Sequence, residues 1–206
     1  MDEILKYFPT LSDLQRSQFE ALQALYIDLN SKVNVISRKD IDNLYVNHVL
    51  HSLVIAKFIT PVRDTAMIDL GCGGGFPGIP LAIIWPGCRF HLIDRIGKKV
   101  NVARTVAEAI GLENCTFQHG DSGECRQKFD YVVSRAVMSL PDLIRASQHL
   151  VGSKQRNKLH NGLICLKGGE LRDEIAATRR DVLDVPLSDY YSEPYFETKH
   201  LLYTPL

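Results

Sequence analysis

The residues best suited to bind a ligand lie in one short segment, IDLGCGGGFPG at positions 68–78. An apolar run ends there in Asp69, and four glycines follow within positions 71–75. Glycine permits backbone angles and close ligand approaches that a side chain would prevent. The segment therefore predicts a strand that turns sharply into a loop, which holds a ligand against bare backbone.

Two nucleotide-binding patterns fit this loop. The pattern D-x-G-x-G-x-G over 69–75 is that of methyltransferases that use S-adenosylmethionine (AdoMet). The pattern G-x-G-x-x-G over 73–78 satisfies the dinucleotide fingerprint, in which a helix N-terminus receives a pyrophosphate. AdoMet has no phosphate and needs room for a sulfonium amino acid, and the two prolines that flank Gly78 suit a stiff turn at a helix start. The loop favours the methyltransferase pattern, with the dinucleotide pattern as the alternative.

Asp94 ends a second short apolar run, RFHLID at 89–94, which suits a parallel strand. Its carboxylate could accept hydrogen bonds from both hydroxyls of a ribose, and NAD sites use the same device about twenty residues after the glycines. Asp94 therefore supports a nucleoside ligand without choosing between the two patterns. The alternative is a solvated aspartate at a strand end.

Arg135 follows the apolar run over 129–134, which would place its guanidinium at the carboxyl end of a sheet. Open α/β folds bind their ligands at that end. A guanidinium is a planar fork that binds a carboxylate or a phosphate at two points. Arg135 is thus expected to hold the carboxylate of AdoMet or a phosphate of a nucleic acid, with a surface ion pair as the alternative.

Five sequence blocks follow one another along the chain: NHVLHSL at 47–53, DLGCGGGFPGIPL at 69–81, LIDRIGKK at 92–99, VSRA at 133–136, and GLICLKG at 162–168 followed by Glu170 and Leu171. Together they resemble the glucose-inhibited division protein B family. These are bacterial methyltransferases that act on guanine N7 of small-subunit rRNA. The resemblance covers roughly residues 25 to 175, and the extension FPGIP is far more specific than the glycines.

The resemblance implies a Rossmann-like class I AdoMet-dependent methyltransferase, with a mostly parallel α/β sheet covered by helices on both faces. It implies methylation of a guanine N7 in the decoding-site region of 16S rRNA, so the expected partner is 16S rRNA or the small ribosomal subunit. That nitrogen has a lone pair and no proton to remove, so alignment and electrostatics would supply the rate without a general base. The alternative is an AdoMet-dependent enzyme that acts on a small molecule or a protein.

Site residues follow from the resemblance and from the residues themselves. Relatives typically carry an Arg-Ala-Glu-like triplet beside the adenine, where this chain has residues 121–123 (DSG), and this departure puts cofactor affinity in question. His48 and His51 lie three positions apart without a Cys or acidic pair nearby, so no metal is expected. His48 is expected to face the cleft, whereas the role of His51 is open. The residues expected to bind AdoMet are Gly71, Gly73, Phe76, Asp94, Ser122, Gly123 and Arg135; those for RNA are Arg38, Lys98 and Lys99; and the catalytic candidates are His48 and Lys167.

Composition indicates how the chain could bind RNA and in which compartment it is expected. Lys plus Arg equals Asp plus Glu at 24 each, so RNA binding would need a local basic patch rather than a global positive charge. The five cysteines form no Cys-x-x-Cys pair, and no stretch resembles a signal peptide or a membrane span. A soluble cytoplasmic protein is expected. Its oligomeric state is open, with a monomer as the simplest expectation.

The chain is expected to form a single methyltransferase domain over 1–206, with an N-terminal helical cap over 1–62 and an AdoMet-binding α/β core over 63–206. A helix with Ser12 as its cap and Gln15 three residues on opens the cap. From residue 66 onward, short β-rich runs alternate with helical patterns, which indicates a parallel sheet. The expected strands are 66–70, 89–94, 115–119, 129–134 and 161–167, the expected helices include 40–58, 97–111, 140–150 and 170–183, and an antiparallel hairpin is expected within 190–203.

Overall fold

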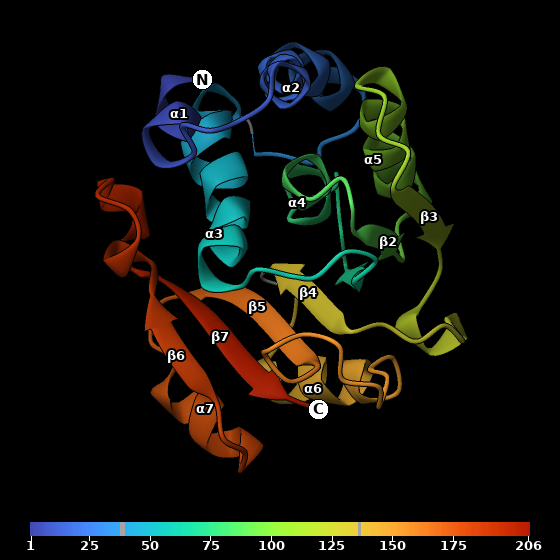
Figure 1. The fold of residues 1–206 in the computed structure, drawn as a ribbon, viewed down its shortest axis with the longest axis vertical. Helices are drawn as coiled ribbons and strands as arrows, with labels where there is room; N and C mark the ends of the chain where they lie inside the picture. Colours follow the sequence, from blue (N-terminus) through green and yellow to red (C-terminus); the bar gives the residue numbers. More distant parts are fainter. Residues whose placement is uncertain (38–39, 136) are drawn as a thin grey trace.

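A seven-stranded sheet organises the chain, as Figure 1 shows for the computed structural model, which describes residues 1–37, 40–135 and 137–206. The strand order is β3-β2-β1-β4-β5-β7-β6. Strands β1 to β5 are parallel, and β7 runs antiparallel to both of its neighbours. The strands are β1 (Ala66–Leu70), β2 (Arg89–Asp94), β3 (Cys115–His119), β4 (Tyr131–Arg135), β5 (Gly162–Gly168), β6 (Leu183–Pro186) and β7 (Lys199–Pro205).

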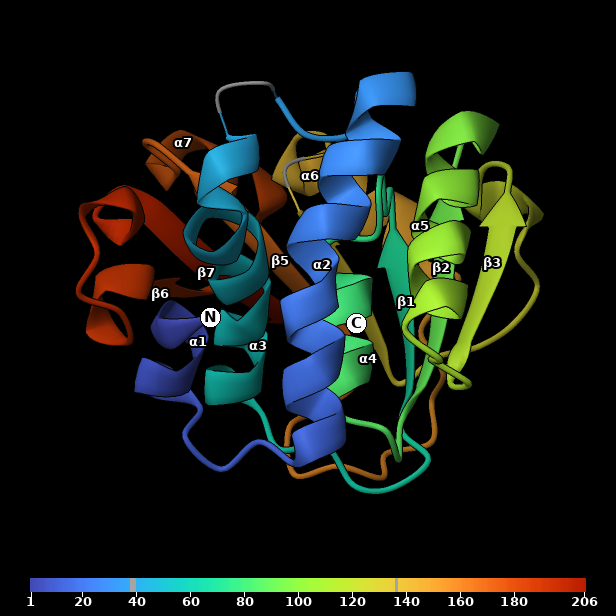
Figure 2. The same ribbon diagram turned by 90° about the horizontal axis from the view of Figure 1, so that it is seen from above.

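Helices cover both faces of this sheet (Figures 1 and 2). Alternation along the strands decides the faces, because successive side chains of a strand point to opposite sides. In β1, Met67 packs into the core below α1 to α5, whereas Ile68 packs against the side that holds α6 and α7. The helices are α1 (Asp2–Tyr7), α2 (Asp13–Lys32), α3 (His51–Phe58), α4 (Gly78–Ile84), α5 (Gly97–Ala109), α6 (Leu140–Gln148) and α7 (Arg172–Thr178).

The direction of strand succession reverses at β1, which pairs with β2 on one side and with β4 on the other. Ligands of open α/β sheets bind in the crevice outside the carboxyl ends of the strands at such a switch point. Asp94 closes β2 and Arg135 closes β4, so both predicted ligand groups lie at this end of the sheet. The expected α/β class, with its mostly parallel sheet, is confirmed.

The N-terminal helices are attached to the sheet layer by side-chain amides and hydroxyls. The predicted cap of α2 is confirmed, because Ser12 and Gln15 form a reciprocal capping box. Gln15 Nε2 also donates to Ile83 O at the end of α4, over 2.9 Å. Tyr26 OH donates to Gly74 O over 2.8 Å and so ties α2 to the glycine loop. The proposed division between residues 62 and 63 stays a prediction.

Two expected elements are wrong. The helix expected over 170–183 ends at Thr178, because Arg179 adopts a left-handed conformation (φ +51°), and Leu183 begins β6. The hairpin expected within 190–203 does not form there, since β7 pairs with β6 instead. The intervening residues form short 3₁₀ turns around the fully buried Phe196.

The helix expected over 40–58 has three parts. A 3₁₀ turn at Ile41–Asn43 precedes a π-helical segment at Tyr45–Leu50, and α3 completes it. A π-helical segment shifts the backbone bonding by one residue relative to an α-helix, and such segments are frequent at functional sites. Within the three described ranges, no helix is long and apolar enough to cross a membrane.

Candidate functional site

A cavity of about 600 Å³ opens at the carboxyl ends of β1, β2 and β4. Its volume falls in the range typical of small-molecule sites, which is about 300 to 1,000 Å³. Six of the seven residues predicted to bind the cofactor lie in its wall, and Gly123 does not. The six are Gly71, Gly73, Phe76, Asp94, Ser122 and Arg135, and the wall also includes Val35, Asp121, Val137, Met138 and Lys99.

The glycine loop closes one side of the cavity. The backbone N–H groups of Gly71 and Cys72 donate to Ile93 O, over 2.9 and 3.1 Å, and so fasten the loop to β2. Gly71 has φ +73°, and a Cβ at this position would lie 2.6 Å from a methyl group of Val137. A side chain at position 71 would therefore be strained and would displace the cavity wall.

Asp94 is both an anchor of the loop and a free acceptor. Its Oδ2 accepts the Gly73 N–H over 2.8 Å, and its Oδ1 accepts the Ile96 N–H over 2.8 Å. A carboxylate offers about four acceptor positions, so two bonds leave capacity for the two hydroxyls of a ribose. Because the side chain lines the cavity, these acceptor positions are open to a ligand that binds there.

Asp69, the first residue of the loop pattern, lies beneath the loop rather than in the cavity wall. It is fully buried, and its Oδ2 accepts the Gly78 N–H over 2.7 Å. Its Oδ1 has no hydrogen-bond partner among the described residues. Burial is the main reason that the pKa of this carboxyl rises to about 7, and the bond from Gly78 opposes the rise. A Cβ on Gly78 would come within 2.8 Å of Asp69 Oδ2, so close packing here requires glycine.

Arg135 is partly buried and its neighbours are neutral. Its Nη2 donates to His48 Nδ1 over 2.9 Å, and its Nη1 donates to Asn47 O over 3.3 Å. Its guanidinium carbon lies 5.1 Å from the centre of the Phe76 ring. Within the described part of the chain, no carboxylate lies within 4.0 Å of this guanidinium. The cavity wall therefore carries a guanidinium that forms no ion pair with the described residues.

The two histidines near Arg135 are uncharged. A guanidinium has no acceptor, so His48 Nδ1 must accept and the ring hydrogen lies on Nε2. Burial, followed by the charge of Arg135, lowers the pKa of His48 to about 3. Burial likewise lowers the pKa of His51, whose Nδ1 lies 3.2 Å from Tyr195 OH. Across residues 1–37, 40–135 and 137–206, no group of three or more His, Cys, Asp or Glu residues could hold a metal.

The segment expected beside the adenine, residues 121–123, forms a tight turn. Asp121 is ion-paired with Arg95 over 2.5 Å and accepts the Gly123 N–H over 2.9 Å. Glu124 turns back to accept the Asp121 N–H over 2.8 Å. Both carboxylates therefore have partners within the protein, and Ser122 and Asp121 are the residues of this turn that face the cavity.

Lys167 lies behind the cavity wall. Its Nζ pairs with Glu174 over 2.6 Å and donates to Met138 O over 2.9 Å. Its side chain is 11 % exposed, and Lys167 does not line the cavity. These bonds hold the Met138 segment, which does line it.

Two of the residues predicted for RNA binding, Lys98 and Lys99, are neighbours at the start of α5. Lys98 is exposed at the start of α5, whereas Lys99 is half-buried and lines the cavity. Arg38 lies outside the described residues. Of these two lysines, Lys99 therefore faces the cavity, and Lys98 faces the solvent.

Sequence reasoning missed the acceptors that hold Arg135. Asn47 binds Arg135 only through its backbone carbonyl. Every residue has such a carbonyl, so a sequence pattern cannot predict which one accepts from a side chain. Tyr195, which donates to the same carbonyl, belongs to the aromatic C-terminal segment that was expected to be a hairpin. The block at 47–53 was the one sequence signal for these acceptors, since it predicted that His48 faces the cleft.

Comparisons with known proteins agree on one family. A family described as rRNA small subunit methyltransferase G matches residues 15–189. A protein named ribosomal RNA small subunit methyltransferase G from Bacteroides thetaiotaomicron is 56 % identical over 206 residues, which is 100 % of both chains. One of the same name from Phocaeicola vulgatus is 55 % identical over 100 % of this chain and 99 % of its own.

Solved structures share the fold at low sequence identity. A precorrin-6y C5,15-methyltransferase from Geobacter metallireducens has a TM-score of 0.56 at 12 % identity, over 84 % of this chain and 92 % of that chain. Fibrillarin from Aeropyrum pernix, solved with S-adenosylmethionine, has a TM-score of 0.55 at 13 % identity, over 76 % of this chain and 73 % of that one. The fold is that of Rossmann-like class I methyltransferases.

Proposed function

Because the chain belongs to the rRNA small subunit methyltransferase G family, we propose that it transfers a methyl group from AdoMet to N7 of a guanine in the decoding-site region of 16S rRNA. The identity of more than half of all residues over the full length supports the choice of an rRNA acceptor over a metabolite or a protein. A neutral net charge is compatible with this acceptor when positive charge is gathered near the cavity.

The observation that carries the cofactor assignment is the pair of ionisable groups in one cavity, Asp94 and Arg135. Asp94 has spare acceptor capacity for ribose hydroxyls. Arg135 has no carboxylate partner in the described protein, so it suits the carboxylate of the amino-acid part of AdoMet. Ser122 would contact the adenine end, whereas the Gly123 N–H is already bonded to Asp121. The residues therefore fit AdoMet.

The residues of the site position groups rather than exchange protons. When bound, AdoMet supplies an electrophilic methyl group on a sulfonium. Guanine N7 offers a lone pair without a proton, so no general base is required. His48 uses Nδ1 to accept from Arg135, and Lys167 is paired with Glu174, so we assign both to positioning. The protein would then accelerate the reaction by holding the two reactants in line.

The acceptor would be approached from the side of α5. Lys98 and Lys99 open this helix next to Asp94, so they can neutralise phosphates close to the point of transfer. We include Arg38 in the proposed RNA contact on its sequence position alone. The proposed site of action is the cytoplasm, where small ribosomal subunits are assembled.

The function is tested by offering methyl-labelled AdoMet with separate acceptors. These are unmodified small ribosomal subunits, 16S rRNA extracted from them, and an RNA-free pool of bacterial proteins and metabolites. We expect label in the RNA of at least one of the first two samples and none in the third. Label in the third sample alone would overturn the rRNA assignment and favour a metabolite or protein methyltransferase. Asp94→Ala is the matched variant that should abolish labelling of RNA.

A further inference from the structure

One backbone carbonyl joins the C-terminal segment to the cavity. Tyr195 OH donates to Asn47 O over 3.2 Å, and Arg135 Nη1 donates to the same oxygen over 3.3 Å. Asn47 lies in the π-helical segment Tyr45–Leu50. The carbonyl therefore receives one hydrogen bond from a residue of the cavity wall and one from a residue outside it.

The directions of the hydrogen bonds form a consistent series. Because Tyr195 OH donates to Asn47 O, its oxygen is free to accept from His51 Nδ1 at 3.2 Å. Arg135 then donates with Nη1 to Asn47 O and with Nη2 to His48 Nδ1. Linked hydrogen bonds of this kind polarise and stiffen one another in a poorly solvated environment.

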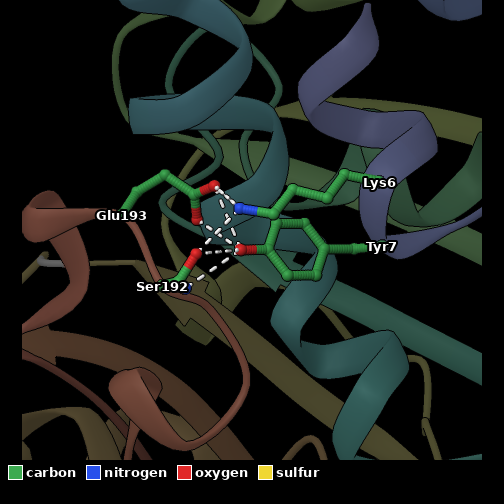
Figure 3. A network of polar contacts seen from close by, with 4 residues as sticks. All are labelled: Lys6, Tyr7, Ser192 and Glu193. Atoms are coloured by element: carbon green, nitrogen blue, oxygen red, sulfur yellow. Dashed lines mark hydrogen bonds and ion pairs between the residues drawn. The ribbon is translucent and has the colours of Figure 1, made fainter.

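The C-terminal segment is fixed on both sides of Tyr195. Figure 3 shows Lys6 and Tyr7 of α1 reaching to Ser192 and Glu193. Tyr7 OH donates to Glu193 over 2.8 Å, and Ser192 N donates to Tyr7 OH over 2.9 Å. These contacts place the chain just before Tyr195.

An aromatic cluster fixes the other side. Phe196 is fully buried, and the centre of its ring lies 4.7 Å from the ring centre of Tyr191 and 5.1 Å from that of Tyr195. The Tyr191 hydroxyl is buried and has no partner within the described ranges. In this cluster, the Tyr195 hydroxyl therefore makes hydrogen bonds, whereas the Tyr191 hydroxyl makes none with the described residues.

Removal of the Tyr195 hydroxyl would change the bonds of Arg135. His51 Nδ1–H would lose its Tyr195 acceptor, and the Asn47 backbone, whose hydrogen bond with His51 raises the pKa of that histidine against the effect of burial, would be the remaining one. A buried donor that lacks a partner is unfavourable, so His51 would compete with Arg135 for that carbonyl. The guanidinium would then lose one of its two hydrogen bonds, those to Asn47 O and His48 Nδ1.

We propose that Tyr195 is a positioning residue: through the Asn47 carbonyl, it holds the Arg135 guanidinium in the orientation that receives the carboxylate of AdoMet. This inference rests on the proposed function, because it assumes that Arg135 binds that carboxylate. It assigns a role in cofactor recognition to a residue outside the cavity wall.

The test compares Tyr195→Phe with Tyr191→Phe, which removes a second hydroxyl, one without a hydrogen-bond partner among the described residues. Dissociation constants are measured by calorimetry for AdoMet and for 5′-methylthioadenosine, which lacks the amino-acid part and its carboxylate. We expect Tyr195→Phe to weaken AdoMet binding about three- to tenfold, the loss of roughly one hydrogen bond, and to leave methylthioadenosine unchanged. Tyr191→Phe should change neither constant.

An equal loss for both ligands, or no loss for either, would overturn the inference. In an Arg135→Gln background, Tyr195→Phe should have no further effect on AdoMet, and an additive loss would contradict the proposed route. If Tyr195→Phe does not fold, Tyr7→Phe loosens the same segment from the surface and should give a smaller loss for AdoMet alone; unchanged AdoMet affinity in that variant would reject the inference. Failure of the unaltered protein to bind AdoMet would instead refute the proposed function.

Discussion

Arg135 Nη2 lies 2.9 Å from His48 Nδ1, so two basic side chains share one hydrogen bond at the wall of the cavity. The arrangement is stable only while the histidine is neutral, which agrees with the lowering of its pKa to about 3 by burial and by the guanidinium. The positive charge of the pair therefore stays on Arg135. An anionic ligand group can neutralise that charge, whereas an ionised histidine would lose the lone pair that accepts from Arg135 and would repel the guanidinium.

Asp94→Asn should weaken AdoMet binding about 10- to 100-fold. The amide removes the charge that strengthens the hydrogen bonds from the ribose hydroxyls, and such bonds contribute about 1.5 to 3 kcal/mol. Calorimetric titration measures the change. Asp184→Asn is the matched control, because Asp184 pairs with His200 between β6 and β7 and should leave AdoMet affinity unaltered. Equal affinities for all three proteins would remove the ribose contact from the account.

Gly78→Ala should destabilise the fold by about 1 to 3 kcal/mol, although alanine is the better helix former. The new Cβ would lie 2.8 Å from Asp69 Oδ2 and 3.0 Å from Leu92, so the packing of α4 against the sheet must shift. Urea denaturation measures the free energy of unfolding. Gly152→Ala is the control, since its Cβ would meet nothing closer than 3.5 Å. Similar stability of both variants would show that α4 tolerates the shift.

Asp69→Asn should remove one pH dependence of stability. The pKa of Asp69 rises from an ordinary 3.8 to about 7 on folding, so the folded protein binds an extra proton between these values. The protonated carboxyl therefore stabilises the fold fully below about pH 4, and this contribution is lost as the pH rises through 7.

The measurement for Asp69 is the difference in unfolding free energy between the unaltered protein and Asp69→Asn, without AdoMet, from pH 4 to pH 8. We expect the unfolding free energy of the unaltered protein to fall relative to that of Asp69→Asn as the pH rises towards 7. The fall is at most about 1.4 kcal/mol per pH unit for one proton. The histidine titrations are common to both proteins and cancel in the difference. Parallel stability curves would show that Asp69 is ionised throughout.

Lys98→Gln and Lys99→Gln should differ in their effects. Lys98 is exposed and outside the cavity wall, so its loss should raise the KM for ribosomal subunits and reduce the salt slope of binding by about one, without changing AdoMet affinity. Lys99 lines the cavity, so its loss should both lower the affinity for AdoMet and raise the KM for ribosomal subunits. Lys32→Gln, in an exposed pair with Asp28, is the control for a lost surface charge. An unchanged KM in both variants would place the RNA contact elsewhere.

The parallel part of the fold was predictable because each strand there carries its own local signal. The runs at 66–70, 89–94 and 115–119 coincide with β1, β2 and β3. The last strands were not predictable in this way. Leu183 begins β6 because β7 offers it a partner about twenty residues on, and the helical spacing of the preceding residues gave no sign of that distant pairing.

The site was predictable where a side chain faces the ligand. Asp94 and Arg135 follow strands whose ends meet at one edge, so the sequence sufficed to bring them into one wall. The supporting bonds were not predictable, since the Asn47 carbonyl is chemically the same as any other. Gly123 also shows the limit, because its N–H is taken by the side chain of Asp121 two positions earlier.

The central claim is tested most directly by mapping the transferred methyl group on the RNA. Unmodified small ribosomal subunits are incubated with the protein and methyl-labelled AdoMet, and the extracted 16S rRNA is reduced with borohydride and cleaved with aniline, which breaks the chain at 7-methylguanosine. We predict one new cleavage, at a guanine in the decoding-site region, which is absent when Asp94→Ala replaces the unaltered protein. Labelled RNA without cleavage, or bound AdoMet without labelled RNA, would contradict guanine N7 as the acceptor.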